Sequence, residues 1–180
     1  MSRRNQQVAP VHQVDFALTV VEYNCIVAAA KAMNTPLSLL FTTAALEAAH
    51  ALGYYEGFLL PHRAPPGTWN NLPPREPPEV ATKRIAINVP SLNHQTIKRA
   101  AEGQLGIGWP EPVQTFMIGS TLRFIATLLF RVQAALQDTS ASPEDRAAFT
   151  ALLANFDACF QEVSQRAQVR FEVPGSYFMK

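Results

Sequence analysis

Residues 13–18 and residues 84–89 each alternate apolar and polar side chains along the chain. A period of two predicts a half-buried strand in each stretch. The apolar positions of the two stretches match at an offset of 71 residues, with Val14, Phe16 and Leu18 corresponding to Ile85, Ile87 and Val89. The same offset relates Ile26 to Ile97 and Ala29-Ala30 to Ala100-Ala101. These matches indicate an internal repeat, whose copies usually need one another to bury their apolar faces.

Each predicted strand leads into apolar positions at helical spacing. Residues 21–33 predict a first helix, and the Asn34-Thr35-Pro36 turn separates it from a second helix that runs to about Leu52. We expect Thr35 to be the N-cap of that second helix, Pro36 its first residue, and Gly53 its C-terminal stop.

The second copy follows the same order but has a longer turn. Residues 84–89 are followed by a helix, a turn over residues 103–112 (GQLGIGWPEP) and an apolar helix over residues 118–136. Trp109 in that turn is expected to cover the core.

The order of strand, helix, turn and helix resembles the ribbon-helix-helix family of DNA-binding proteins. In the first copy the segments F-A-L-T, E-Y-N-C-I-V-A-A-A-K-A-M-N and T-P-L-S-L-L-F-T-T-A-A-L-E-A-A carry the resemblance, which is strongest to antitoxin-type members. The second copy departs from the pattern in its long turn. The family folds as homodimers, so two copies imply a monomer that acts as a single-chain pseudodimer, similar to tandem accessory proteins of conjugative and T-DNA transfer. The implied fold class is mainly α, with a short two-stranded antiparallel ribbon that pairs residues 13–18 with residues 84–89.

Composition divides the chain into five segments. These are a polar arm at 1–11, a first strand-helix-helix unit at 12–52, a Pro-rich linker at 53–82, a second unit at 83–138, and a C-terminal helix and tail at 139–180. The linker aromatics Tyr54, Tyr55, Phe58 and Trp69 are expected to pack across the body. Ser142 and Pro143 are expected to begin the last helix, whose apolar stripe is Phe149, Leu152, Leu153, Phe156, Phe160 and Val163, followed by a strand at 169–173.

Composition and motifs favour a folded protein without a cofactor or a metal. The net charge of +1 argues against binding nucleic acid by bulk charge, so phosphate contacts would need local basic clusters. Cys25 and Cys159 are expected to be core residues, and the four histidines lack metal-ligand spacing. No signal-peptide pattern follows Met1, and Arg123 and Arg131 interrupt the apolar residues 118–136, so we expect a cytoplasmic protein that does not span a membrane.

The resemblance implies that outward strand side chains read base edges in the DNA major groove. By alternation the outward residues are Gln13, Asp15 and Ala17 on the first strand and Arg84, Ala86 and Asn88 on the second. Arginine pairs with guanine and amides pair with adenine, so Arg84, Asn88 and Gln13 are the expected readers. Asp15 would repel phosphate unless it accepts from cytosine, and the alternative is that these are solvated residues of an exposed face.

Phosphate contacts are expected beside the ribbon. Lys83, Lys98 and Arg99 are the basic candidates of the second unit, although Lys98 and Arg99 equally suit a solvated helix face. In the first unit, backbone N–H groups from Thr35 to Ser38 begin the second helix and could hold an anion.

The expected function is sequence-specific binding of double-stranded DNA, without catalytic activity, as a DNA-transfer accessory factor or a transcriptional regulator. The alternative is a protein-interaction module, antitoxin-like or an adaptor, in which DNA contacts are weak or absent and residues 142–180 bind a protein partner. Near-neutral charge and Asp15 favour the alternative, and Arg84 with Asn88 favours DNA.

Overall fold

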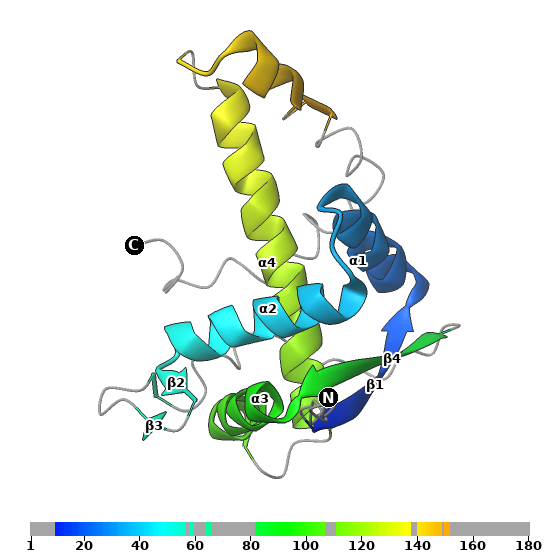
Figure 1. Cartoon of the computed structure of the whole chain (residues 1–180), viewed down its shortest axis with the longest axis vertical. Helices are drawn as coiled ribbons and strands as arrows, with labels where there is room; N and C mark the ends of the chain where they lie inside the picture. Colours follow the sequence, from blue (N-terminus) through cyan, green and yellow to red (C-terminus); the bar gives the residue numbers. More distant parts are fainter. Residues whose placement is uncertain are drawn as a thin grey trace, which may run out of the picture.

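The computed structural model describes residues 10–56, 58–59, 64–65, 82–106, 111–137, 140–148 and 150–151. This part of the chain is mainly helical with a small antiparallel ribbon, as the sequence predicted. The elements in chain order are β1 (Val11–Thr19), α1 (Val20–Ala32), α2 (Leu37–Ala51), β2 (Tyr54–Tyr55), β3 (Phe58–Leu59), β4 (Thr82–Pro90), α3 (Ser91–Leu105) and α4 (Pro112–Gln137). Figure 1 shows α2 crossing the long α4, with the β1–β4 ribbon beside them.

The central structural prediction, the antiparallel pairing of residues 13–18 with residues 84–89, is confirmed. β1 and β4 pair along their whole lengths, from Val11 opposite Pro90 to Thr19 opposite Thr82. Between its two ends, the inner row of the ribbon is apolar and largely buried, and it includes Val14, Phe16, Leu18, Ile85, Ile87 and Val89. A one-residue slip would turn this row out to solvent, so the apolar pattern itself fixes the register.

The boundaries of the elements repeat at the offset seen in the sequence. β1 begins at residue 11 and β4 at residue 82, and α1 and α3 begin at residues 20 and 91. Both strands have 9 residues, and each leads into its helix without a connecting loop. The repeat therefore covers the backbone course of the strand and the start of the helix.

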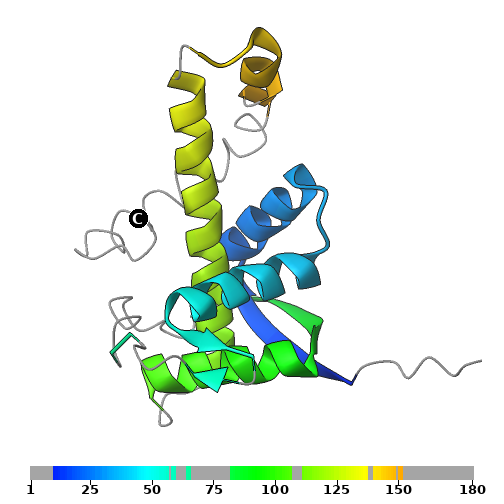
Figure 2. The ribbon, with the colours of Figure 1, turned by 60° about the vertical axis from the view of Figure 1, so that its left-hand side comes forward.

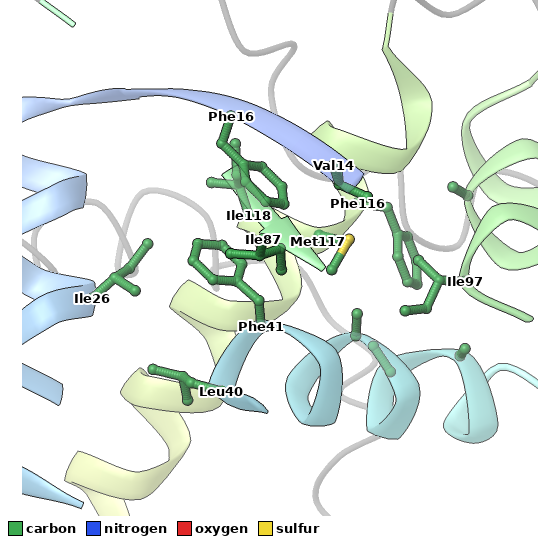
Figure 3. Close-up of a cluster of buried hydrophobic side chains, with 14 of the residues drawn as sticks. Val14, Phe16, Ile26, Leu40, Phe41, Ile87, Ile97, Phe116, Met117 and Ile118 are labelled. Atoms are coloured by element: carbon green, nitrogen blue, oxygen red, sulfur yellow. The ribbon is translucent and has the colours of Figure 1, made fainter. Parts of the chain in front are cut away.

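The hydrophobic core lies between the inner face of the ribbon and the helices. Figure 3 shows Phe16 pointing from β1 toward Phe41 on α2, and the two rings stack with centroids 4.7 Å apart. α4 adds Phe116, Met117 and Ile118. Six apolar residues that the repeat offset relates to one another are all buried, namely Phe16, Leu18, Ile26, Ile87, Val89 and Ile97.

Small residues let the helices approach the centre of the molecule. The matched pairs Ala29-Ala30 on α1 and Ala100-Ala101 on α3 are buried. Cys25 is buried beside them on α1, as expected of a core residue, whereas Cys159 lies outside the described residues.

The start of α2 differs from the prediction. Pro36 is the N-cap, with an extended ψ of 145°, and Leu37 is the first helical residue. Thr35 lies one residue before the N-cap, and its hydroxyl donates to the carbonyl of Met33, at 3.1 Å. The predicted stop is confirmed, since Gly53 follows the helix with a positive φ of 87° that suits glycine.

A capping box at the start of α1 was missed. The Glu22 backbone N–H donates to the Thr19 hydroxyl at 3.1 Å, and the Thr19 backbone N–H donates to the Glu22 carboxylate at 2.9 Å. This reciprocal pair joins the end of the strand rigidly to the helix. The T-V-V-E spacing at residues 19–22 is the sequence signal that could have revealed it.

The predicted turn over residues 103–112 is shorter than expected. α3 continues to Leu105, α4 begins at Pro112, and Gly103 is inside α3. A Cβ at Gly103 would stand 2.1 Å from the hydroxyl oxygen of Tyr54, so the missing side chain makes room for that ring. Trp109 lies outside the described residues.

The segment expected to be a linker begins with a small hairpin. β2 and β3 pair as Tyr54 with Leu59 and Tyr55 with Phe58. Tyr54 is buried, which confirms that this aromatic packs on the body, and Tyr55 stacks on His50 with ring centroids 4.7 Å apart. Trp69 and the prolines from 66 to 78 lie outside the described residues.

The helix after α4 begins where the sequence predicted. Residues 143–148 are helical, and the Ser142 hydroxyl accepts from the backbone N–H of Asp145 at 3.1 Å. The expected apolar stripe from Phe149 onward and the strand at 169–173 lie outside the described residues.

α4 is the longest helix of the described part of the chain, and its later turns extend beyond α1, α2 and α3 (Figure 2). It is long and apolar enough to cross a membrane, and its most apolar 18-residue window has a mean hydropathy of 1.4. Half of its most apolar window is buried inside the molecule, as in a core helix. The cytoplasmic location stays a prediction from the sequence.

Candidate nucleic-acid interface

The outer face of the β1–β4 ribbon carries a row of small and polar side chains opposite the buried row. Gln13, Asp15, Arg84, Ala86 and Asn88 are exposed, and Ala17 is partly exposed. Six predicted site residues therefore share one surface, because successive side chains of a strand point to opposite faces.

The register places these residues in three cross-strand pairs. Gln13 is opposite Asn88, Asp15 is opposite Ala86, and Ala17 is opposite Arg84. Side chains directly opposite in an antiparallel pair have Cβ atoms about 4.5–5.5 Å apart. One end of the ribbon therefore presents two amides side by side, and the other presents a guanidinium beside a methyl group.

Asp15 is held to Gln13 on the same strand. The Gln13 amide nitrogen Nε2 donates to the Asp15 carboxylate oxygen Oδ1 at 3.0 Å. An ionised carboxylate only accepts hydrogen bonds, so it orients the amide with its nitrogen toward Asp15. The Gln13 carbonyl oxygen and its second N–H point elsewhere.

Lys83 lies apart from this surface. It is opposite Leu18 and belongs by alternation to the inner row of the ribbon, but it is exposed at the ribbon's end. Its sequence neighbour Arg84 points to the outer face, so the structure does not bring Lys83 and Arg84 onto one face.

Lys98 and Arg99 are both exposed on α3. The Lys98 ammonium is 3.7 Å from the Glu102 carboxylate one helical turn later, in an exposed pair that contributes little to stability. The corresponding residues of α1, at an offset of 71, are Val27 and Ala28. Basic groups that could reach phosphate are therefore concentrated on the second unit.

The start of α2 offers backbone donors instead of charge. The N-cap residue Pro36 has no side chain that can accept a hydrogen bond from the first turn. The first helical hydrogen bond runs from the Leu40 N–H to the Pro36 carbonyl. Thr35 and Ser38 are half-buried there, and the Thr35 hydroxyl donates to the carbonyl of Met33. The first-turn N–H groups lack a side-chain cap, which is the chemistry that anions recognise at helix ends.

A histidine pair at the end of the ribbon was missed by the sequence analysis. His12 on β1 and His94 on α3 stack with ring centroids 4.5 Å apart. Beside them, the backbone N–H and the hydroxyl of Ser91 both donate to the carbonyl of Pro10. The residues are about 80 positions apart in the chain, so no local pattern could have paired them.

This pair predicts a dependence of stability on pH. Burial, then the His12 ring, then the Lys98 ammonium lower the pKa of His94 below its ordinary value. Protonation of His94 is less favourable in the folded state than in the unfolded state. The neutral His94 ring therefore contributes to stability above the unfolded-state pKa of about 6.5, and this contribution is lost as the pH falls through the lower folded-state pKa.

We therefore expect the urea concentration at the unfolding midpoint to decrease as the pH is lowered from about 7.5 to about 5. His94→Gln should flatten the dependence in that window. His50→Gln, which removes a histidine from α2, is the matched control and should keep it. An unchanged slope in His94→Gln would show that His94 does not carry the effect.

Within the described residues, no group of three or more histidine, cysteine, aspartate or glutamate side chains is arranged to hold a metal ion. Comparison of the chain with protein-family models, curated proteins and solved structures finds no match.

Proposed function

We propose that this protein binds double-stranded DNA by placing the outer face of the β1–β4 ribbon in the major groove. The observation that carries the proposal is the ribbon itself, a paired two-stranded element with one face buried in the core and the other exposed. The major groove admits a two-stranded ribbon, and the exposed arginine and amides can bond base edges.

The proposal includes a single-chain pseudodimer of the ribbon-helix-helix type. At the repeat offset of 71 residues, Asp15 corresponds to Ala86, and these two residues are directly opposite one another. In the repeat, Gln13 corresponds to Arg84 and Ala17 corresponds to Asn88. In the ribbon, each residue is opposite the other one's counterpart, so Gln13 pairs with Asn88 and Ala17 pairs with Arg84. This is the register that a twofold axis through the Asp15–Ala86 pair would produce, and it supports the fused-dimer interpretation.

Phosphate contacts in this proposal come from the two kinds of site beside the ribbon. Lys98 and Arg99 on α3 supply charge, and the first turn of α2 supplies uncapped backbone N–H groups. Each phosphate neutralised by a cation releases counterions, so binding should weaken as salt rises. A role in DNA transfer or in transcriptional regulation follows from the family resemblance alone.

Fluorescence anisotropy of a labelled random-sequence duplex at about 50 to 200 mM salt tests the proposal. We expect Lys98→Ala or Arg99→Ala to weaken binding to all sequences alike and to reduce the salt slope by about 1 if that residue contacts one phosphate. Arg131→Ala removes an exposed arginine from α4 and is the matched control, which should leave the slope unchanged.

A second candidate function is protein binding. Phe130 on α4 is 66% exposed, and the outer face of the ribbon includes the carboxylate of Asp15. A single exposed aromatic is ordinary on a protein surface, so the near-neutral net charge and Asp15 are what favour this alternative. Failure of the wild-type protein to bind any duplex at low salt would overturn the DNA proposal and favour this one.

A further inference from the structure

The two ends of the ribbon differ in chemistry although they occupy equivalent places in the repeat. A symmetric ribbon would present the same pair of side chains at each end. Here one end pairs Gln13 with Asn88, and the other pairs Arg84 with Ala17. A twofold axis would relate Gln13 to Arg84 and Ala17 to Asn88, and in each of these two pairs the residues differ.

We infer that the ribbon recognises a DNA site without dyad symmetry, an inference that rests on the proposed function. The Gln13–Asn88 end selects A·T pairs, and the Arg84–Ala17 end selects a G·C pair with a thymine methyl beside it. An amide bonds the N6 and N7 atoms of adenine at once, arginine bonds O6 and N7 of guanine, and the alanine methyl contacts the methyl of thymine.

The spacing of the two ends sets the spacing of the selected bases. Gln13 and Ala17 are four residues apart on one strand, which corresponds to about 13 Å at roughly 3.3 Å per residue. Base pairs follow one another every 3.4 Å or so along the duplex. A ribbon that follows the groove therefore separates its A·T and G·C preferences by about four base pairs.

Asp15 acts in this arrangement as a positioning residue at the centre of the ribbon. It takes one N–H of the Gln13 amide, at 3.0 Å. The amide nitrogen carries two N–H groups, so the second N–H and the carbonyl oxygen stay available for the N7 and N6 atoms of adenine. The carboxylate thus fixes the orientation of a base-reading group instead of reading a base itself.

Selection from a random duplex pool, followed by sequencing of the retained DNA, tests the inference. The wild-type protein should enrich an asymmetric site with an A·T preference at one end and a G·C preference at the other. Arg84→Ala should lose the G·C preference by roughly 5- to 150-fold and keep the A·T preference. Asp15→Ala should weaken the A·T preference alone.

A gain-of-symmetry variant gives the sharpest comparison. Gln13→Arg combined with Ala17→Asn gives both strands arginine and asparagine at the outer positions, so the enriched site should become palindromic there. Circular dichroism and the urea midpoint of each variant check that the fold is intact. A palindromic site for the wild-type protein, or no base preference at the ends, would overturn the inference while duplex binding persists. Loss of all duplex binding in the wild-type protein would instead overturn the proposed function.

Discussion

Replacing Phe16 by Ala is expected to lower the free energy of unfolding by about 3–5 kcal/mol. The side chain is 2% exposed and stacks on Phe41, so truncation removes apolar contacts and leaves a cavity between β1 and α2. Stacked aromatic pairs add about 0.5–1.5 kcal/mol beyond the area they bury. This contact therefore joins the ribbon to α2 within the core.

Urea denaturation of the variant measures the loss. Phe130→Ala is the matched control, since this phenylalanine is 66% exposed and its removal should change stability by no more than about 0.5 kcal/mol. A double-mutant cycle with Phe41→Ala should show coupling between the two rings. A Phe16→Ala protein with an unchanged midpoint would show that the ribbon does not rest on this core.

Replacing Gly103 by Ala is expected to destabilise the protein by about 1–3 kcal/mol, although alanine is the better helix former. The new Cβ would stand 2.1 Å from the Tyr54 hydroxyl oxygen and 2.9 Å from the ring carbon Cζ. Tyr54 is buried on β2, so its ring has little room to retreat.

The sign of this effect should reverse when the obstructing ring is removed. In a Tyr54→Ala background, Gly103→Ala should stabilise the protein by about 0.5–1 kcal/mol through helix propensity. Thermal or urea unfolding of the wild-type protein, the two single variants and the double variant gives the effect of Gly103→Ala in each background. Destabilisation of equal size in both backgrounds would mean that Tyr54 does not occupy this place.

The two strands of the ribbon could be predicted from the sequence because the alternation of apolar and polar residues is a local and periodic pattern. Alternation identified both strands, and the match between Phe16 and Ile87 at a fixed offset indicated that they were equivalent. Their antiparallel pairing came from the family resemblance, and the structure confirms it. The side chains on the outer face followed directly from the alternation.

The errors arose where distant residues decide local structure. Gly103 was assigned to the turn over residues 103–112, but Tyr54, far away in the chain, explains why a glycine stands inside α3. The stacking of His12 on His94 depends on the same kind of long-range contact. The cap of α2 is a local error of one residue instead, because Pro36 and not Thr35 takes the N-cap position.

Two features of the candidate site could be seen only in the structure. Alternation alone placed Gln13 and Asn88 on the outer face, but only the pairing of the strands shows that they are neighbours. The hydrogen bond from Gln13 to Asp15 lies within one strand and needed the side-chain geometry instead. Both features support an asymmetric reading surface.

An NMR titration of the isotope-labelled protein with the selected duplex tests the central claim most directly. If the ribbon enters the major groove, the largest changes in amide chemical shift should fall on residues 13–17 and 84–88, with smaller changes at the start of α2 and around Lys98 and Arg99 on α3. Changes confined to α4 around Phe130, or none at a duplex concentration that saturates binding, would contradict the account.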